Sequence, residues 1–573
     1  MRPGSFRAVL ALLFAASAVA FASAQEPAVA RFLWTSYWSV PPDVWTGQSS
    51  FMPPEQEQLT NRSDLGVAFS GGGTRSAAAT VGALRGLLSN GWLRRVRYIA
   101  AVSGGSWASV PFTYAPADPA TLLGPMMAPE QLEKALVEAL PPKQSLARSI
   151  VDSKLLAPGA AEAAKLWAQS ELLKRDITPQ VQSFLNRFVR GAADETYANI
   201  LGKIFIEPYV PDGTERRYTW NTPSINTIKE LNPSLSVSDF VQATVDRPFL
   251  IVSGTMIYMH PAYDYPRLIP VEYTPLYTGV RQQFGTRLGG IYVSPYAYDV
   301  AGADQPRDGR LRVRVRPADR PFTLADVIAS SGAAPLLALL RAQPLQAVRQ
   351  ATAIFPSFNH FTVRGPDDRP EAEPIVEDLL HGDGGFSDNL GIMPLLARHV
   401  HNILVFVNAK EPLEQNESVE SMFWKLDKQD DTGGDRSMNA VFERDNYWKL
   451  KSGLADAVDK GGAAVYCDRD WKVLANELYN IAPYEGLNIC WVYNQLIPSW
   501  VRRLPQQTQE LVASKGFKRF PWFSTFGQNI PYVIRLKPAQ VNLLAHLAAW
   551  TVTNPTSRQE IEKTFGDALH ERN

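Results

Sequence analysis

The sequence predicts an α/β fold: a central, mostly parallel β-sheet with helices on both faces and a helical insertion. Three short apolar runs, at 65–69, 98–102 and 403–407, have the length and composition of buried strands. The first two are each followed by a glycine-rich turn and a helical pattern, which is the order that builds parallel sheets. A hydrophobic content of 45% with 20% charged residues is typical of a globular protein.

Length and charge narrow the class of protein. The 573 residues suffice for one large domain, and we expect 25–573 to form a single domain with the insertion at about 120–245. Lysine plus arginine and aspartate plus glutamate both number 57, so there is no basic surplus to bind nucleic acid. We therefore expect no nucleic-acid partner.

The N-terminus has the pattern of a signal peptide. Arg2 and Arg7 precede an apolar run over 8–21, and the small residues Ala22-Ser23-Ala24 then provide a cleavage site. This predicts a signal peptide over 1–24 and an exported protein that is secreted, periplasmic or peripheral on a membrane. An uncleaved N-terminal anchor is the alternative.

The next segment, 25–60, reads as irregular chain rich in proline and aromatic residues. Two interpretations stay open: a strap packed on the domain surface, or an aromatic patch that touches lipid. The aromatic residues are Trp34, Tyr37, Trp38, Trp45 and Phe51.

Further elements follow from periodicity and from breaks at glycine and proline. The patterns predict helices within 128–205, a strand over 249–258, a loop-rich stretch over 267–319, a helix within 322–340, a surface loop over 411–436 and an apolar helix over 541–550.

The chain has two cysteines, Cys467 and Cys490. Two cysteines exclude an all-cysteine zinc site, and in an exported protein they are candidates for one disulfide. Two separate buried thiols are the alternative. We expect no metal and no organic cofactor.

Ser103 is the candidate nucleophile. It stands directly after the buried strand 98–102 and before Gly104-Gly105, in the form of a nucleophile elbow, where a sharp turn exposes the serine hydroxyl at the end of the sheet. Ala101 occupies the position of the first glycine in the G-x-S-x-G pattern. Alone, this motif is also compatible with an ordinary strand-to-helix turn.

A second turn, Ser70-Gly71-Gly72-Gly73-Thr74-Arg75, also joins a strand to a helix. It lacks the Gly-Lys of a phosphate-binding P-loop, and Ser76 replaces the last glycine of a dinucleotide fingerprint. An oxyanion hole fits better, because glycines let backbone N–H groups approach an anion, and Arg75 adds positive charge near an oxyanion or a lipid phosphate.

Asp383, between Gly382 and Gly384, is the candidate base. A carboxylate on a glycine turn can take a proton from Ser103 directly or orient a histidine. His381 is the nearest histidine in the sequence, and we expect it to support the site or lie at the surface rather than react.

Taken together, these motifs resemble the patatin and cytosolic phospholipase A2 superfamily, including its lysophospholipase (phospholipase B) branch. The similar blocks are Ser70–Arg75, Val102–Trp107, Asp383-Gly384-Gly385, the segment Ala329–Pro335, and Val271–Pro275 with Phe284-Gly285-Thr286. They occur in family order between Gly66 and about Val407.

The resemblance implies a serine acyl hydrolase that uses a Ser103-Asp383 dyad and no cofactor. Gly72, Gly73 and Gly104 would line the oxyanion hole, and Arg75 would hold the charged group of a phospholipid or lysophospholipid. Contact with a membrane surface would be peripheral. Two alternatives remain: a non-catalytic exported lipid-binding relative, and a Ser-His-Asp esterase acting on non-lipid esters.

Overall fold

The computed structural model describes residues 31–153, 197–258, 267–285, 288–304, 306–315, 320–334, 336, 355–362, 375–424, 439–523 and 536–570. The predicted signal peptide, 1–24, lies outside these residues, as does the part of the predicted helical insertion at 154–196.

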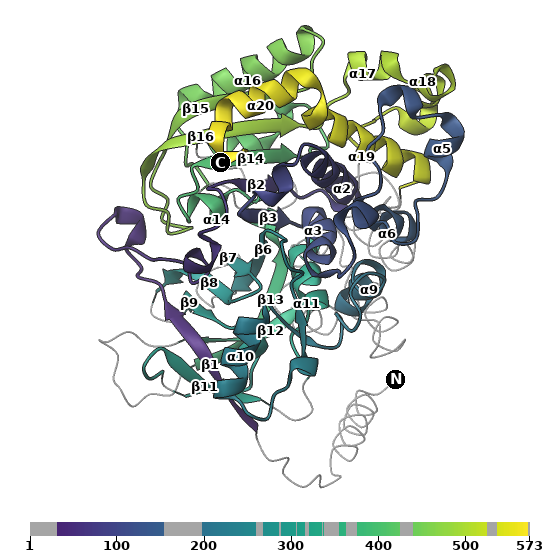
Figure 1. Ribbon diagram of the computed structural model, residues 1–573. Helices are drawn as coiled ribbons and strands as arrows, with labels where there is room; N and C mark the ends of the chain where they lie inside the picture. Colours follow the sequence, from purple (N-terminus) through teal and green to yellow (C-terminus); the bar gives the residue numbers. More distant parts are fainter. Residues whose placement is uncertain are drawn as a thin grey trace, which may run out of the picture.

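A 14-stranded sheet forms the centre of the described structure (Figure 1). Its parallel core runs in the order β6 (Phe249–Tyr258), β3 (Tyr98–Val102), β2 (Gly66–Phe69), β14 (Asn402–Val407) and β16 (Tyr484–Tyr493). The three strands that the sequence predicts most directly, β2, β3 and β14, are thus neighbours in this core.

The remaining strands pair antiparallel, so the sheet is mixed rather than mostly parallel as predicted. Beyond β6 the order continues through β7 to β9, β1, β11 and β10, while β15 closes the other edge, and β12 pairs with β13. These strands are β1 (Arg31–Ser39), β7 (Arg267–Tyr273), β8 (Thr278–Phe284), β9 (Leu288–Val293), β10 (Gly302–Ala303), β11 (Arg310–Val315), β12 (Ser357–Thr362), β13 (Ile375–Asp383) and β15 (Val465–Val473).

Two predictions were wrong here. The stretch 267–319 is not loop-rich but supplies β7 to β11, and the segment 25–60 is not wholly irregular, because β1 occupies its described start. The signal was period-2 alternation: in β11, Leu311 and Val313 are buried between exposed arginines, and in β1, Leu33 and Thr35 are buried on either side of the exposed Trp34. Short alternating segments carry less hydrophobicity than buried strands and are easily taken for loops.

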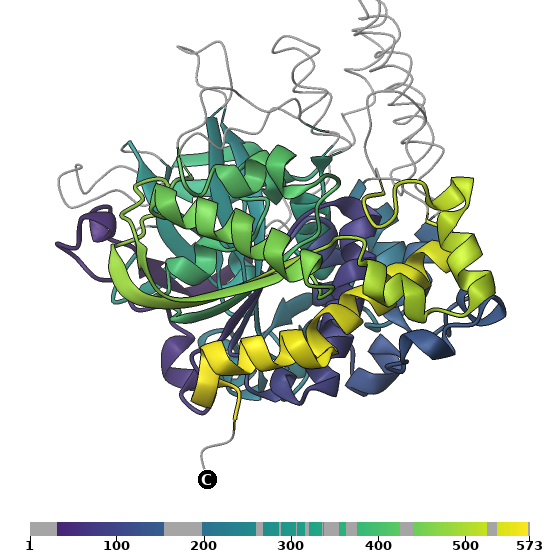
Figure 2. The same cartoon turned by 90° about the horizontal axis from the view of Figure 1, so that it is seen from above.

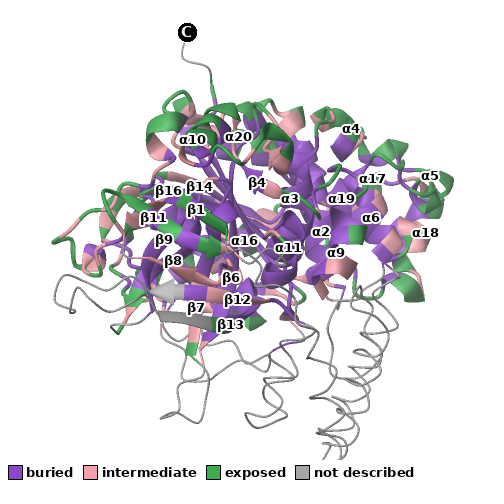
Figure 3. Cartoon of the chain, turned by 90° about the horizontal axis from the view of Figure 1, so that it is seen from below, coloured by how far each residue is buried: buried purple, intermediate pink, exposed green. Residues whose placement is uncertain are grey.

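Helices cover both faces of the sheet, as predicted. Successive strand residues enter opposite cores: Val67 and Phe69 of β2 join a cluster with α2 (Gly73–Ser89) and α19 (Pro538–Thr553), whereas Ala68 joins a second cluster. That second cluster includes residues of α14 (Met393–Leu396) and α16 (Arg444–Asp459). Figure 2 shows α16, in green, and the yellow C-terminal helices on opposite sides of the sheet. The central elements are buried, and exposed residues gather on peripheral helices such as α5, α10 and α18 (Figure 3).

Between β3 and β6 the described residues are mainly helical, with one small parallel pair of strands. These elements are α3 (Gly104–Tyr114), α4 (Pro119–Leu123), α5 (Lys134–Glu138), α6 (Leu146–Asp152), α9 (Tyr197–Phe205), α10 (Thr222–Leu231), β4 (Arg217–Thr219) and β5 (Phe240–Gln242). The other helices are α11 (Leu324–Ser331), α15 (Glu417–Glu420), α17 (Pro498–Arg503), α18 (Gln506–Ala513) and α20 (Pro555–Phe565).

Cys467 on β15 and Cys490 on β16 lie opposite each other and form a disulfide, with 4.0 Å between their Cα atoms. In the part of the chain that the structure describes, no helix combines the length and hydropathy needed to cross a bilayer.

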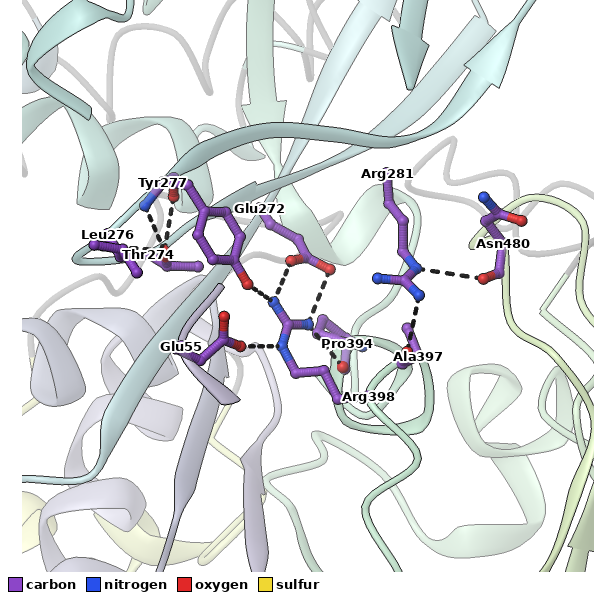
Figure 4. Close-up of polar contacts among 10 residues, drawn as sticks. All are labelled: Glu55, Glu272, Thr274, Leu276, Tyr277, Arg281, Pro394, Ala397, Arg398 and Asn480. Carbon is purple, nitrogen blue, oxygen red and sulfur yellow. Dashed lines mark hydrogen bonds and ion pairs between the residues drawn. The ribbon is translucent and has the colours of Figure 1, made fainter. Parts of the chain in front are cut away.

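A buried ion cluster ties the N-terminal segment to the sheet (Figure 4). Arg398, after α14, donates from Nε to Glu55 (2.9 Å) and from both terminal nitrogens to the Glu272 carboxylate on β7 (3.2 and 2.6 Å). It also donates to the Pro394 carbonyl and the Tyr277 hydroxyl, so each of its five N–H groups has an acceptor. Burial alone would lower the pKa of Arg398, but the carboxylates of Glu272 and Glu55 raise it above its ordinary value.

We expect Arg398→Ala to lower the free energy of unfolding by about 3–5 kcal/mol, because it leaves two buried carboxylates without their cation. Urea denaturation measures this change. Arg558→Ala, which breaks the exposed pair with Glu562, is the control and should cost less than about 1 kcal/mol. Equal losses for the two variants would contradict the structural importance of the buried cluster.

Candidate active site

Ser103 and Asp383 meet along one edge of β6. β7 occupies the other edge of that strand, at Val252–Tyr258. β3 pairs with the first half of β6 up to Val102↔Ser253, and β13 pairs with the second half down to Asp383↔Gly254. Because β3 is parallel to β6 and β13 antiparallel, their C-terminal ends face each other. The structure therefore brings the two predicted residues, 280 positions apart, into contact.

Ser103 occupies a strained elbow between β3 and α3. Its backbone has φ 51° and ψ −124°, outside the regions that a serine prefers. Such a conformation costs of the order of 1–3 kcal/mol and persists only where the surroundings hold it. The hydroxyl of Ser103 donates to Asp383 Oδ2 at 2.8 Å, and both residues are buried, at 5% and 4% exposed.

The Asp383 carboxylate is held from its other oxygen as well. Oδ1 accepts a hydrogen bond from the backbone N–H of Gly385 at 2.7 Å, within the turn that follows β13. The hydroxyl of Thr255 on β6 donates to the Asp383 carbonyl at 2.9 Å. The carboxylate thus presents Oδ2 to the serine from a fixed position.

The two glycine turns touch each other beside Ser103. A Cβ on Gly104 would lie 1.9 Å from the carbonyl oxygen of Gly73, and a Cβ on Gly71 would lie 3.2 Å from the Cβ of Ser103. Gly72 and Gly73 have φ of 135° and 57°, which favour glycine. Gly73 and Gly104 are the first residues of α2 and α3, and N–H groups at a helix start have no carbonyl partner within the helix. Two helix N-termini, with their positive dipole ends, therefore converge on the serine.

Asn408, just after β14, holds the first glycine turn in place. This role was not predicted from the sequence. Its N–H donates to Ser70 Oγ at 2.7 Å, its side-chain amide donates to Ser76 Oγ at 3.1 Å, and its carbonyl accepts from Arg75 Nε at 3.1 Å. The available signal was topological: the predicted strand 403–407 ends at the same sheet edge as the two turns.

Arg75 lies beneath the glycine turn and is 4% exposed. Its guanidinium donates to the backbone carbonyls of Asn408 and of Phe523, the latter at 2.5 Å. Burial lowers its pKa to about 10, and the nearby Glu411 opposes this shift, so the side chain stays charged at neutral pH. The predicted role in holding a substrate phosphate stays a prediction, and the observed contacts are to the backbone.

His381 lies in an aromatic pocket and uses both ring nitrogens away from the serine. Nδ1 is 2.9 Å from the Leu379 carbonyl, which requires a proton on Nδ1, and Nε2 then accepts from the Tyr298 hydroxyl at 3.0 Å. The residue is 0% exposed, and burial lowers its pKa to about 3. It is therefore neutral near pH 7 and supports the packing of β13. It does not lie at the surface, which was one of its two predicted positions.

Three other histidines contact groups away from Ser103 and Asp383. His401 contacts Asp64, His546 contacts Arg85, and His399 stacks on Tyr484. His260 lies outside the described residues. Within the ranges that the structure describes, no group of three or more histidine, cysteine, aspartate or glutamate residues is arranged to hold a metal ion.

Comparison with known proteins identifies the class. The model of the patatin-like phospholipase family matches residues 67–396, more than half of the chain, and the chain belongs to this family. The description of the family is that of a phospholipase. The matched segment contains both glycine turns, Ser103 and Asp383.

The solved structures that are similar to this chain include two of one human enzyme. Human GIVD cytosolic phospholipase A2 is 15% identical, with a TM-score of 0.44 over 92% of this chain and 62% of that chain. The same human enzyme in complex with methyl gamma-linolenyl fluorophosphonate is 14% identical, with a TM-score of 0.41 over 92% and 62%. The chain spans less than two thirds of the length of these proteins. A comparison with curated protein sequences finds no match.

Because its contacts are to backbone carbonyls, we expect Arg75→Lys to lower kcat/KM about tenfold on a neutral aryl ester and on a phospholipid alike. Lysine keeps the charge but cannot reach both carbonyls with a planar fork. Steady-state kinetics on both substrates measure the ratio of kcat/KM between variant and wild type. The control is Arg519→Lys, because Arg519 lies close to Arg75 in the structure. A loss confined to the phospholipid would instead support the predicted contact with the lipid phosphate.

His381 also predicts a pH dependence of stability. An unfolded histidine binds a proton below about pH 6.5, but folded His381 does so only near pH 3, so stability is complete above pH 6.5 and falls as the pH drops toward 3. Between pH 6 and 4, we expect each pH unit to lower the free energy of unfolding of the wild type by about 1 kcal/mol more than that of His381→Gln. Urea unfolding at several pH values tests this. His570→Gln, at an exposed position, is the control, and parallel curves for wild type and His381→Gln would contradict the prediction.

Proposed function

We propose that this protein is an exported phospholipase or lysophospholipase that hydrolyses acyl ester bonds through a Ser103-Asp383 dyad and an acyl-enzyme. The observation that carries the proposal is the 2.8 Å hydrogen bond from Ser103 Oγ to Asp383 Oδ2, beside two converging helix N-termini. Family membership supports lipid substrates.

In the first half-reaction, Ser103 Oγ attacks the acyl carbonyl carbon while its proton passes to Asp383. The carbonyl oxygen becomes an oxyanion, and backbone N–H groups of the two glycine turns, at Gly72, Gly73 and Gly104, stabilise its charge. When the intermediate collapses, the bond to the leaving alcohol breaks and Asp383 returns the proton to that oxygen. The products are an acyl-enzyme and a deacylated lipid.

In the second half-reaction, water attacks the acyl-enzyme and gives a proton to Asp383. The ester bond to Ser103 breaks, the proton returns to the serine oxygen, and the fatty acid leaves. A carboxylate is a weak base for a serine hydroxyl, so the mechanism depends on low exposure and on fixed donors at the oxyanion.

Export is part of the proposal and rests on sequence. The pattern over 1–24 is that of a signal peptide, and the disulfide between Cys467 and Cys490 suits an oxidising compartment. The expected destinations are the periplasm, the exterior or a membrane surface with peripheral contact. Detection of a mature chain that begins at Gln25 tests this step.

The nucleophile is tested by Ser103→Ala, which should abolish ester hydrolysis and prevent covalent labelling by an alkyl fluorophosphonate. Ser109→Ala is a matched control, because Ser109 lies within α3, the helix that Ser103 precedes, is also buried, and has a hydroxyl without a hydrogen-bond partner among the described residues. Mass spectrometry locates the label, and circular dichroism checks the fold. Turnover by a folded Ser103→Ala protein would refute the assignment, and lipid binding without turnover in the wild type would favour the non-catalytic alternative.

The base is tested by Asp383→Asn, which keeps the size of the side chain and an oxygen for the Gly385 N–H. We expect kcat to fall about 10²- to 10⁴-fold, because the side-chain amide of asparagine is too weak a base to take the proton of the serine hydroxyl. Each histidine, including His260, is replaced by glutamine in parallel and should stay active within a few-fold. A folded histidine variant as inactive as Ser103→Ala would make the enzyme a triad esterase.

A further inference from the structure

The segment Ala329–Pro335 resembles a family block, but the proposed mechanism assigns no role to any of its residues. In the structure, Ser331 is the last residue of α11, and α11 lies against β6, β13 and α3 (Figure 1). Its hydroxyl is 0% exposed and reaches the backbone of the nucleophile.

The Ser331 hydroxyl stands between the elbow and the central strand. The backbone N–H of Ser103 donates to Ser331 Oγ at 2.8 Å, and Ser331 Oγ donates to the Ser253 carbonyl on β6 at 2.7 Å. Regular pairing of β3 with β6 ends one residue earlier, at Val102↔Ser253. One side-chain hydroxyl therefore continues the connection to β6 at the residue where the backbone leaves the sheet.

The direction of this bridge is fixed. A serine hydroxyl has one proton, and because it goes to the Ser253 carbonyl, the oxygen can only accept from Ser103. All three residues are buried, at 5% exposed for Ser103, 6% for Ser253 and 0% for Ser331. A buried N–H that loses its acceptor has no ready replacement.

The Ser253 carbonyl is also close to the other half of the dyad. A Cβ on Gly384, the residue after Asp383, would lie 2.3 Å from this oxygen. The carbonyl is thus a common reference point: the Asp383 turn packs on it directly, and Ser103 is connected to it through Ser331. A shift of Ser103 relative to this point changes the Ser103–Asp383 distance.

From these contacts we propose that Ser331 is a positioning residue, whose hydroxyl holds the strained backbone of Ser103 at the distance from Asp383 that proton transfer requires. This inference rests on the proposed function, because it assigns Ser331 to the same dyad. It predicts that Ser331 affects the rate of the chemical step and not the binding of substrate.

The experiment compares wild type, Ser331→Ala, Ser331→Cys and Ser330→Ala on a soluble aryl ester. Ser330 is the matched control: it is the preceding residue of α11, is also 0% exposed, and its hydroxyl donates to the Asp326 carbonyl of its own helix. We expect Ser331→Ala to lower kcat and the rate of labelling by an alkyl fluorophosphonate about 10- to 100-fold, with KM changed less than twofold. Ser330→Ala should keep both rates within about threefold.

Thermal unfolding separates positioning from a general loss of structure. Equal rate losses in Ser330→Ala and Ser331→Ala would overturn the proposal, as would a folded Ser331→Ala with the wild-type labelling rate. If Ser331→Ala fails to fold, Ser331→Cys decides, because it conserves size but weakens both hydrogen bonds; a wild-type labelling rate then overturns the proposal. Activity retained in Ser103→Ala would refute the proposed function itself, whereas an inactive Ser103→Ala beside a normal Ser331→Ala would refute only this inference.

Discussion

The geometry of the site depends on one edge of β6 being shared by two strands that arrive from opposite directions. β3 and β13 cannot overlap on that edge, so the end of each strand fixes where the other ends, at Val102↔Ser253 and Asp383↔Gly254. A serine and a carboxylate placed at those two ends must meet. Because strand register is set by whole residues and by which face is buried, a slip in either strand would separate the two side chains or turn one to the other face. The Ser103–Asp383 contact is thus a consequence of register as much as of the elbow itself.

The site also depends on residues beyond the 67–396 segment that the family model covers. Asn408 and Phe523 supply the backbone carbonyls that hold Arg75, and Asn408 binds both serines that flank the glycine turn. α19 packs so closely on α2 that a Cβ on Gly82 would lie 2.0 Å from the Ala545 carbonyl oxygen. Since α2 begins at the glycine turn, the position of that turn is set partly by a helix near the C-terminus. The surroundings of the site are therefore built from the family segment and the C-terminal region together.

The sequence allowed the parallel core to be predicted and the two residues of the proposed dyad to be singled out, because each depends on local information. Apolar runs such as 65–69 and 98–102 reveal fully buried strands, and the glycines beside Ser103 and Asp383 reveal turns. β1 and β11 were missed, since only alternate residues are buried in them and the alternation is short. β8 and β9 are mostly buried, but glycine and polar residues interrupt their sequences, TGVRQQF and LGGIYV, so they give no apolar run. The surroundings of His381 and Arg75 were not predictable either, because their partners, such as Tyr298 and Phe523, lie 83 and 448 residues away. Pairing at such distances leaves no periodic signal in one sequence.

In the proposed mechanism, the arrangement of charge around Ser103 lets a two-residue site stabilise the oxyanion without a side-chain cation. The nearest arginine of the glycine turn, Arg75, donates to Asn408 and Phe523 and is 4% exposed, so its charge is directed at the protein backbone. Under that proposal, positive potential at the substrate carbonyl oxygen comes mainly from the N-termini of α2 and α3, whose dipoles are fixed by the fold. Fixed dipoles need little reorganisation as negative charge develops on the carbonyl oxygen, and low exposure keeps water from screening them. The same low exposure makes any misplacement of Ser103 costly, because no solvent can replace a lost hydrogen bond. A site built in this way requires a rigid elbow, and the strained φ of Ser103 is tolerated because strands, two helices and buried hydroxyls hold it from several sides.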